Sequence, residues 1–173
     1  MEFRKVIQER YSCRRYTDKP VEKEKLDAVL EAGRLAPTGS NEQRNKHIIV
    51  TDKALIHEMV AACKDQQWIH TAPAILVEVG GSDRTMVCGH SVRLVDGAIA
   101  MSYMTLEAVS LGLQFVWLGW FEPEKVRKVL NIPEDYIVVA VAPLGYPAKD
   151  GKPAPKKSAE EVIVYNKMGF YRL

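Results

Sequence analysis

The sequence predicts a layered domain of the α/β or α+β class, with about four strands and five or so helices around one core. Its 173 residues are enough for a single domain, residues 1–173, that buries a sizeable core. Hydrophobic residues make up 47% and charged residues 27%, which is typical of a soluble globular protein. Short apolar segments of strand length are mixed with segments that show the 3.6-residue period of a helix.

The N-terminal part of the chain predicts two helices. Apolar residues recur every three to four positions over residues 2–10, which indicates a short amphipathic helix. The same spacing over Glu22–Leu35 predicts a second helix, and Pro20 lies just ahead of it. Pro37 ends that helix, because the residue before a proline avoids helical geometry.

The middle of the chain predicts two strands with a helix between them. His47–Thr51 is a short apolar strand, and Asp52 is placed to cap a helix that keeps its period as far as Cys63. Ala74–Val79 is a second apolar strand. Gly80–His90 shows no clear period, so we expect a variable excursion there.

Val92–Leu113 has the longest helical pattern in the sequence. Apolar residues lie on more than one face of it, which predicts a central, buried helix. Met101 and Met104 then serve packing. Asp96, near the start of this helix, is a candidate buried acid, and a satisfied structural carboxylate is its expected role.

The last part of the chain predicts two more strands and a helix. Gln114–Gly119 is a strand that ends at a glycine, and Pro123 lies in the first turn of the helix that follows it. Ile137–Ala142 is β-branched and apolar, the strongest strand pattern in the chain. After a segment rich in Pro and Lys, Ser158 and Glu161 fit a capping box, which predicts a last short helix or an extended arm.

Charge and cysteine content exclude several classes of function. The net charge is only +2, whereas nucleic-acid-binding proteins usually show a clear basic excess. The N-terminus lacks the apolar core of a signal peptide, and no apolar run is long enough to span a membrane. Cys13, Cys63 and Cys88 form no CxxC pair, so we expect reduced thiols in the cytoplasm. His70 and His90 have no second ligand at helical spacing, and no metal site is predicted.

A basic turn follows the first helix. Arg10, Arg14 and Arg15 lie within six positions, together with the hydroxyl of Ser12. Arginine presents a rigid fork of donors that matches the geometry of a phosphate, and a serine hydroxyl adds a short donor. The turn is therefore a candidate site for the phosphate of a bound cofactor. The alternative is a solvated basic turn on the surface.

Several motifs together resemble the nitroreductase family. Arg10–Tyr16 resembles its Arg-Arg-Ser-x-Arg-x-aromatic signature, and the polar loop Ala36–Gln43 resembles its Ala-Pro-Ser-x-x-Asn-x-Gln signature. Asp96–Leu113 is similar to the family's central helix, and Trp117–Phe121 to its Trp-Ile-Gly-x-Phe turn. Leu144–Pro147 matches its C-terminal part. The resemblance covers almost the whole chain in the right order and spacing.

The resemblance implies an FMN-dependent oxidoreductase with an α+β fold. Members of this family are three-layer α/β/α sandwiches, with a central, mostly antiparallel sheet flanked by helices. They form intertwined homodimers, in which two flavin sites lie at the interface and each is built from both chains. The implied electron donor is NADH or NADPH, and the implied acceptor is a nitroaromatic, a quinone or a related small molecule.

The resemblance also assigns residues to the flavin site. Arg10, Ser12 and Arg14 bind the ribityl phosphate, with Tyr11 nearby, and Lys156 or Lys157 adds a second cation. Pro37, Thr38, Gly39 and Asn41 come from the other subunit and line the isoalloxazine. Val116, Leu118 and Gly119 present backbone to the flavin ring, where a small residue permits close approach.

The implied reaction needs no side-chain nucleophile. The flavin carries the hydride chemistry in a ping-pong cycle, in which the nicotinamide leaves before the acceptor binds. No catalytic side chain and no metal ligand is therefore assigned. Other readings keep the flavin but change the role: reduction of an enal, a halogenated aromatic or flavin itself, or a storage or sensing role without turnover. A further alternative is a small module that binds a phosphate metabolite and no flavin.

Overall fold

The computed structural model describes residues 2–81 and 83–168. Its helices are α1 (Phe3–Glu9), α2 (Lys23–Arg34), α3 (Lys53–Ala62), α4 (Val92–Ser110), α5 (Pro123–Val129) and α6 (Ala159–Val162). Two 3₁₀ turns are η1 (Gly39–Asn41) and η2 (Gln67–Thr71). The strands are β1 (Asn45–Val50), β2 (Ala74–Gly80), β3 (Gln114–Phe115) and β4 (Ile137–Gly145). Most boundaries fall within one to three residues of the ranges expected from the sequence.

The four strands form one sheet in the order β1-β2-β4-β3, and each neighbouring pair is antiparallel. All seven residues of β2 are buried, because helices cover both faces of this central strand. Successive side chains of a strand point to opposite faces, so Leu76 enters one core and Val77 the other. This double burial explains why the sequence of β2 is apolar throughout instead of alternating.

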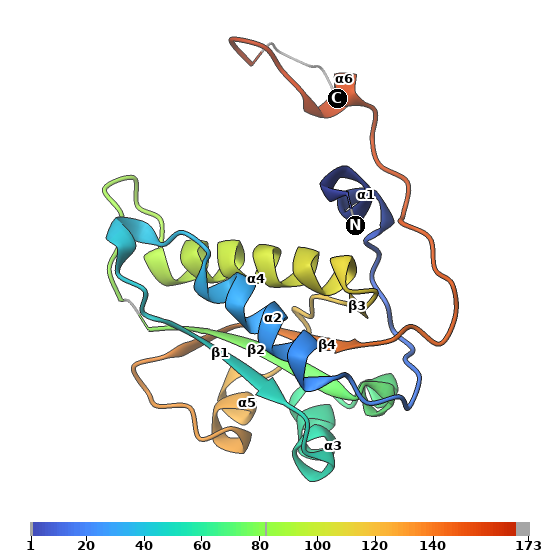
Figure 1. Cartoon of the computed structure of the whole chain (residues 1–173). Helices are drawn as coiled ribbons and strands as arrows, with labels where there is room; N and C mark the ends of the chain where they lie inside the picture. Colours follow the sequence, from blue (N-terminus) through green and yellow to red (C-terminus); the bar gives the residue numbers. More distant parts are fainter. Residues whose placement is uncertain (1, 82, 169–173) are drawn as a thin grey trace.

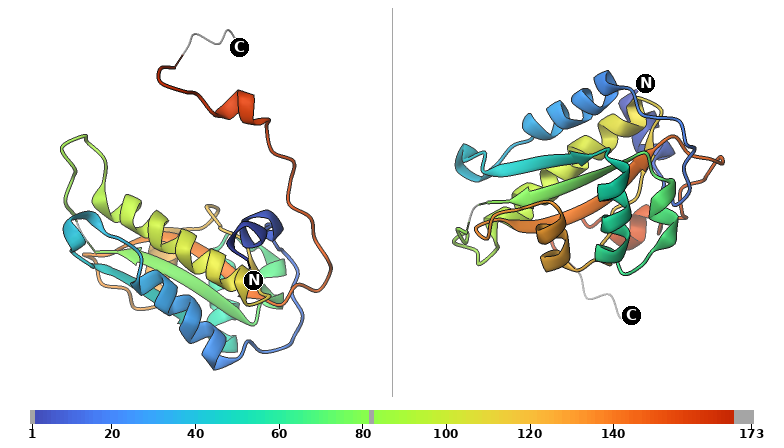
Figure 2. Two further views of the ribbon diagram at one scale, coloured as in Figure 1. Left: turned by 45° about the horizontal axis from the view of Figure 1, so that its top comes forward. Right: turned by 90° about the horizontal axis from the view of Figure 1, so that it is seen from below.

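The molecule has three layers (Figures 1 and 2). Helices α2 and α4 cover one face of the sheet, where Val29 and Met104 pack in one core with residues of β2 and β4, and α1 packs against α4. Helices α3 and α5 cover the other face, where Met59 and Val126 are fully buried. The predicted three-layer α+β sandwich with an antiparallel sheet is thus confirmed.

Helix α4 is the central helix that the sequence predicts. Met101 and Met104 are fully buried within it. Gly97 lets the helix approach β4 closely, since a Cβ there would lie 2.9 Å from the side chain of Val139. The helix ends at Ser110, three residues earlier than expected, because Gly112 has a left-handed φ of 79° just after the C-cap residue.

The strand expected at 114–119 is shorter in the structure. Only Gln114–Phe115 form a regular ladder with β4, and Leu118 makes an isolated bridge to Val141. The register places Val116 opposite Pro143, whose carbonyl accepts from the Val116 N–H at 3.3 Å. A proline has no N–H to return the second bond of that pair, so the ladder is interrupted there.

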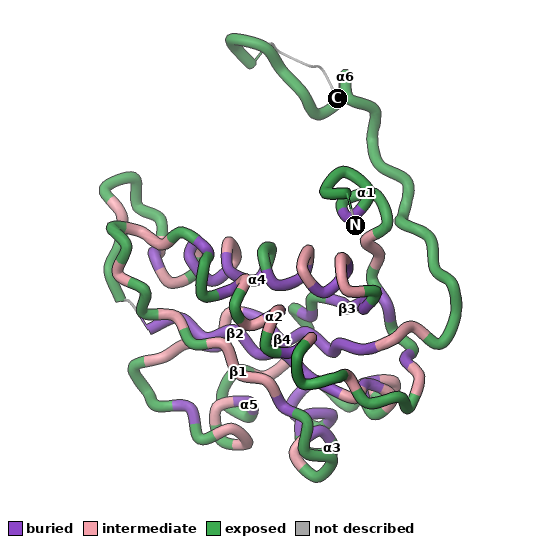
Figure 3. The backbone as a smooth tube through the Cα atoms, viewed as in Figure 1, coloured by how far each residue is buried: buried purple, intermediate pink, exposed green. Residues whose placement is uncertain are grey.

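The C-terminal segment leaves the three layers as an arm. Residues 148–168 are exposed, and the arm extends past α1 away from the sheet (Figures 1 and 3). Ser158 and Glu161 form the predicted capping box at the start of α6. Val162 and Tyr165 are 61% and 83% exposed, so the arm presents apolar side chains to its surroundings. No helix in the described part of the chain is long and apolar enough to cross a membrane.

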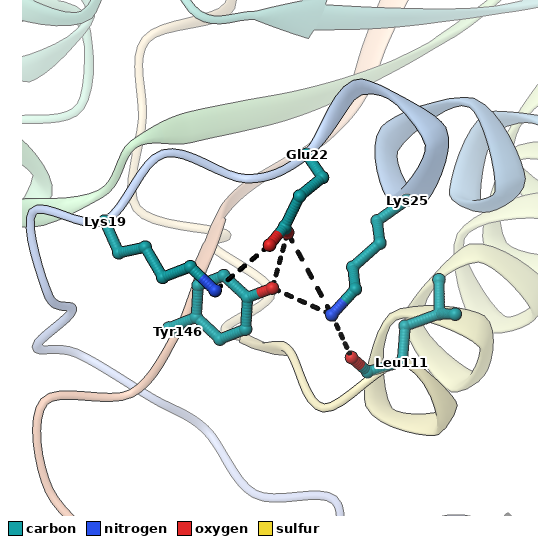
Figure 4. A network of polar contacts seen from close by, with 5 residues as sticks. All are labelled: Lys19, Glu22, Lys25, Leu111 and Tyr146. Carbon is teal, nitrogen blue, oxygen red and sulfur yellow. Dashed lines mark hydrogen bonds and ion pairs between the residues drawn. The ribbon is translucent and has the colours of Figure 1, made fainter.

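A polar network around Tyr146 ties three elements together (Figure 4). The Tyr146 hydroxyl donates to Glu22 at 2.5 Å and accepts from Lys25 at 2.8 Å. Lys25 also donates to the Leu111 carbonyl, so the start of α2, the end of α4 and the end of β4 are joined. Lys19 lies 4.1 Å from the Tyr146 ring centre and pairs with Glu22. The Tyr146 hydroxyl, followed by a backbone N–H and Lys19, lowers the Glu22 pKa to about 2.

The Tyr146→Phe variant should lose part of the acid sensitivity of the wild type. A carboxylate whose folded pKa lies below its ordinary value of 4.5 contributes stability above that value. The contribution is lost as the pH falls towards 2. Removing the hydroxyl raises the Glu22 pKa, so the variant should be less stable at pH 7, and the difference from the wild type should be smaller at pH 2.5. Urea unfolding midpoints test this, and an equal difference at both pH values would contradict the role of Glu22.

Candidate functional site

The basic turn is a stretch of extended backbone fixed along the edge of the sheet. The Cys13 N–H donates to the Phe115 carbonyl of β3 at 3.0 Å. The Thr17 N–H donates to the Tyr146 carbonyl at 2.9 Å. Tyr16 is buried, and its hydroxyl lies 2.7 Å from the Pro143 carbonyl oxygen of β4. The segment is therefore held at both ends by the strands beneath it.

This backbone presents its polar side chains outward. Cys13 and Tyr16 are buried, whereas Ser12, Arg14 and Arg15 are exposed. Arg10 is half-buried at the end of α1. Across residues 2–81 and 83–168, no hydrogen bond or ion pair occupies the side chains of Arg10, Ser12 or Arg14. Their donors are free to bind an anion such as a phosphate.

Tyr11 contacts the start of the C-terminal arm. Its hydroxyl donates to the Lys149 carbonyl at 3.2 Å. Gly151 packs under the ring so closely that a Cβ there would lie 2.1 Å from it. Burial raises the pKa of the Tyr11 hydroxyl. Lys156 and Lys157 lie further along the arm, exposed, and are not brought near the basic turn by these contacts.

Residues 116–119 follow β3, and among them the backbone of Gly119 is accessible. The N–H groups of Val116 and Leu118 donate to carbonyls of β4, at 3.3 and 2.8 Å, and their side chains are buried. No described residue accepts from the Gly119 N–H, and apart from the adjoining residues of the chain no described atom lies within 4 Å of a Cβ built there. Trp117 and Trp120 flank this position and are both exposed. Within the predicted trio, Gly119 is thus the residue whose backbone a planar ligand can reach.

The polar loop lies at the other end of the molecule. Pro37 and Asn41 are exposed, and Gly39 donates its N–H to the Asp96 carboxylate of α4 at 3.0 Å. Asp96 is 3% exposed, so the expected buried structural carboxylate is confirmed. The Thr38 hydroxyl accepts from the Gln43 N–H at 3.1 Å, which closes the loop on itself.

One chain does not bring the predicted flavin residues together. The polar loop lies beside Asp96 near the start of α4, and the basic turn lies beside β3, just past the end of that helix (Figures 1 and 2). From Asp96 to Ser110 the helix rises about 21 Å at 1.5 Å per residue. The structure thus groups the basic turn with Val116–Gly119, and places the loop of Pro37, Thr38, Gly39 and Asn41 apart from them.

A buried acid–base pair lies near the polar loop, and the sequence pattern did not indicate it. His47 Nδ1 is 2.5 Å from a carboxylate oxygen of Glu78, which is fully buried in β2. Burial raises the Glu78 pKa, and His47 opposes that shift in part. The other Glu78 oxygen has no hydrogen-bond partner among the described residues. The signal was present: a single carboxylate inside the otherwise apolar strand Ala74–Val79.

Two further features lie away from these residues. His70, which sequence spacing left isolated, has its ring centre 4.9 Å from that of His57. Both line a cavity of about 600 Å³, and none of the predicted flavin residues lines it. No group of three His, Cys, Asp or Glu side chains in the described ranges is arranged to hold a metal ion.

Known proteins resemble this chain over most of its length. It is 34% identical over 152 residues to an Archaeoglobus fulgidus protein with the provisional name NADH dehydrogenase/NAD(P)H nitroreductase, covering 86% of each. It is 28% identical to a Bacillus subtilis FMN reductase [NAD(P)H], covering 91% of this chain and 71% of that one. A crystal structure of a nitroreductase family protein from Clostridium difficile superposes with a TM-score of 0.87 at 31% identity, covering 97% and 100%.

The sequence profile of the Nitroreductase family matches residues 7–86 and 65–146. These ranges contain the basic turn, the polar loop, the central helix and the segment that ends at Gly119. The matched region, the three-layer fold and the similarity to known members agree, and this chain belongs to the Nitroreductase family.

Proposed function

We propose that the protein is an FMN-dependent oxidoreductase that takes hydride from NADH or NADPH and reduces a nitroaromatic, a quinone or a related small acceptor. The observation that carries the proposal is the fixed basic turn, on which Arg10, Ser12 and Arg14 keep unoccupied donors. Family membership and the similarity to a protein named FMN reductase support it.

The residues present fit the phosphate end of FMN. Two guanidinium groups and a hydroxyl on one short extended segment form a donor set for a phosphate dianion, and no carboxylate competes for them. The backbone of the segment is held by the sheet, so the positions from which these side chains extend are fixed before the ligand binds. Tyr11 stands where the family has a second basic residue, and its hydroxyl contacts the start of the arm instead. Lys156 and Lys157 lie further along this arm, outside the three layers.

The residues near Gly119 fit the ring end. When bound, FMN supplies the hydride-transfer chemistry that the side chains themselves lack. The free Gly119 N–H can donate to an acceptor on the edge of a planar ring, and the missing side chain allows that approach. Trp117 and Trp120 present large apolar surfaces on either side, which would exclude water from the reacting face.

A complete site requires a second copy of the chain. The polar loop of Pro37, Thr38, Gly39 and Asn41 lies far from the basic turn of its own chain, so we propose a homodimer in which it serves the partner's flavin. Each chain would act as one flavin-binding domain over residues 1–173. The exposed apolar residues of the arm support this proposal, because a partner chain would cover them. A reducing cytoplasmic compartment fits the three free thiols.

The visible spectrum of the purified protein, recorded without oxygen, tests the function. We expect a bound oxidised flavin that NADH or NADPH bleaches, and whose colour returns when menadione or 4-nitrobenzoate is added. Flavin that neither nicotinamide reduces would contradict the enzymatic role and favour a storage or sensing protein. Protein that stays colourless after incubation with FMN and gel filtration would contradict the assignment of the basic turn.

A further inference from the structure

The polar loop that is assigned to the flavin holds an unusual backbone conformation. Ser40, Asn41 and Gln43 have φ values of 55°, 56° and 52°, in the left-handed region that residues with a side chain rarely adopt. Three such residues within four positions form a strained segment. A strained segment persists only where its surroundings hold it in place, and such segments cluster at ligand-binding sites.

The first contact that holds the loop comes from α4. The buried carboxylate of Asp96 accepts the Gly39 N–H at 3.0 Å, immediately before the first left-handed residue. Asp96 is fixed on the longest helix of the molecule, so the start of the loop cannot move relative to the core. The space beside Gly39 is narrow on the side of Arg84: a Cβ built on this glycine would lie 3.1 Å from the Arg84 guanidinium.

The second contact comes from Arg84, which lies in the excursion between β2 and α4. Its guanidinium donates to the Gly39 carbonyl at 3.2 Å and to the Ser40 hydroxyl at 3.4 Å. Its Nε forms an ion pair with Glu42 at 2.7 Å. One side chain therefore touches three of the four consecutive residues Gly39–Glu42, and the five donors of the planar guanidinium allow it to do so.

The backbone around Arg84 is itself anchored. The Arg84 carbonyl accepts from the Val92 N–H at 3.1 Å, at the first residue of α4. A short turn follows, closed by the Met86 N–H donating to His90 and by a bridge between Thr85 and Ser91. The excursion is thus a folded connection to α4 over residues 83–91, and Arg84 projects from its anchored end.

We propose that Arg84 and Asp96 are positioning residues that together brace the loop Thr38–Gln43 in the conformation that meets the partner's flavin. This role rests on the proposed flavin function. It affects how tightly and in which orientation FMN binds, and no chemical step depends on it. Asp96 holds Gly39, and Arg84 reaches from Gly39 to Glu42, so the left-handed residues Ser40 and Asn41 lie between two fixed residues. None of the family motifs quoted above covers residues 83–91. The proposal gives this connection a function, because Arg84 holds the loop that contacts the flavin.

The proposal is tested with Arg84→Met and with the pair Asp96→Ala and Asp96→Asn. Asparagine keeps an oxygen that can accept from Gly39, so Asp96→Asn should retain the brace and Asp96→Ala should lose it. Arg127→Met is the matched control, since it removes an arginine paired with Glu124 on the opposite layer. Two readouts are needed: hydrogen–deuterium exchange of a peptide covering residues 36–44 in flavin-free protein, and the dissociation constant for FMN.

We expect Arg84→Met and Asp96→Ala to exchange faster at residues 36–44 and to bind FMN about tenfold more weakly, a loss of about 1.4 kcal/mol. Asp96→Asn and Arg127→Met should match the wild type in both readouts. Unchanged exchange in Arg84→Met would overturn the brace, and faster exchange with unchanged FMN affinity would overturn its role in positioning. A wild-type protein that binds no FMN at all would instead overturn the proposed function, together with the flavin role of the brace.

Discussion

Replacing Arg14 with alanine should weaken FMN binding about ten- to a hundredfold. Hydrogen bonds to charged groups are worth roughly 1.5–3 kcal/mol, and each 1.4 kcal/mol is a factor of ten in affinity. Arg14 is exposed and forms no ion pair in the described structure, so its removal should leave the fold intact and take a cation from the proposed phosphate site. Equilibrium dialysis, or the flavin retained after gel filtration, measures the loss.

Arg15→Ala is the matched control for that experiment. It makes the same change in charge one position along, at a residue that is exposed like Arg14 but that the family resemblance does not assign to the phosphate. The Arg15 carbonyl accepts from Ala148, and this backbone bond survives the substitution. We expect Arg15→Ala to retain FMN like the wild type. Equal losses in the two variants would mean that general positive charge, and not a defined phosphate site, accounts for binding.

His47→Leu should destabilise the protein by about 3–5 kcal/mol at pH 8, because it leaves the buried Glu78 carboxylate without its partner. The loss should shrink as the pH falls. Burial raises the folded Glu78 pKa above its ordinary 4.5, and removing His47 raises it further. Between the unfolded and folded pKa values the folded state binds more protons, so stability falls as the pH rises. Chemical unfolding at pH 5 and pH 8 measures both effects.

The double variant His47→Leu with Glu78→Leu separates charge from packing. Apolar side chains of similar size often replace a buried ion pair without loss of stability, so the double variant should recover most of the stability at pH 8. Its stability should also lose the dependence on pH that His47→Leu shows. A double variant as unstable as His47→Leu would show that the shape of the His47 side chain, and not the buried charge, accounts for the loss.

Much of the fold could be predicted because period and burial agree along most of the chain. The helical spacing of α2 and α4 and the apolar run of β4 follow directly from burial on one or both faces. The predicted length of the strand at 114–119 was wrong because the length depends on the partner strand. Pro143 of β4 interrupts the hydrogen-bond ladder after Phe115. Local pattern cannot reveal which residue of another strand lies opposite.

The sequence predicted the separate segments of the candidate site, but not how these segments are arranged in space. The basic turn and the polar loop were found from residue type and from resemblance to the family. Their placement at opposite ends of α4 depends on tertiary structure, as does the contact of Arg84 with a loop more than 40 positions away in sequence. The carboxylate of Glu78 was visible as an exception within an apolar strand, but its partner His47 comes from the neighbouring strand.

The flavin content of mixed dimers tests the shared site most directly. Arg10→Ala with Arg14→Ala disables the basic turn, and Thr38→Ala with Asn41→Ala disables the polar loop. One heterodimer carries the turn variant in one chain and the loop variant in the other. A second heterodimer carries all four substitutions in one chain and none in its partner, and differently tagged chains allow each to be purified.

If each flavin site takes its turn from one chain and its loop from the other, the first heterodimer keeps one intact site and should retain about half of the wild-type flavin. The second heterodimer should then have no intact site and retain almost none. The reverse result, with flavin in the second heterodimer and none in the first, would show that each site lies within a single chain and would contradict the account.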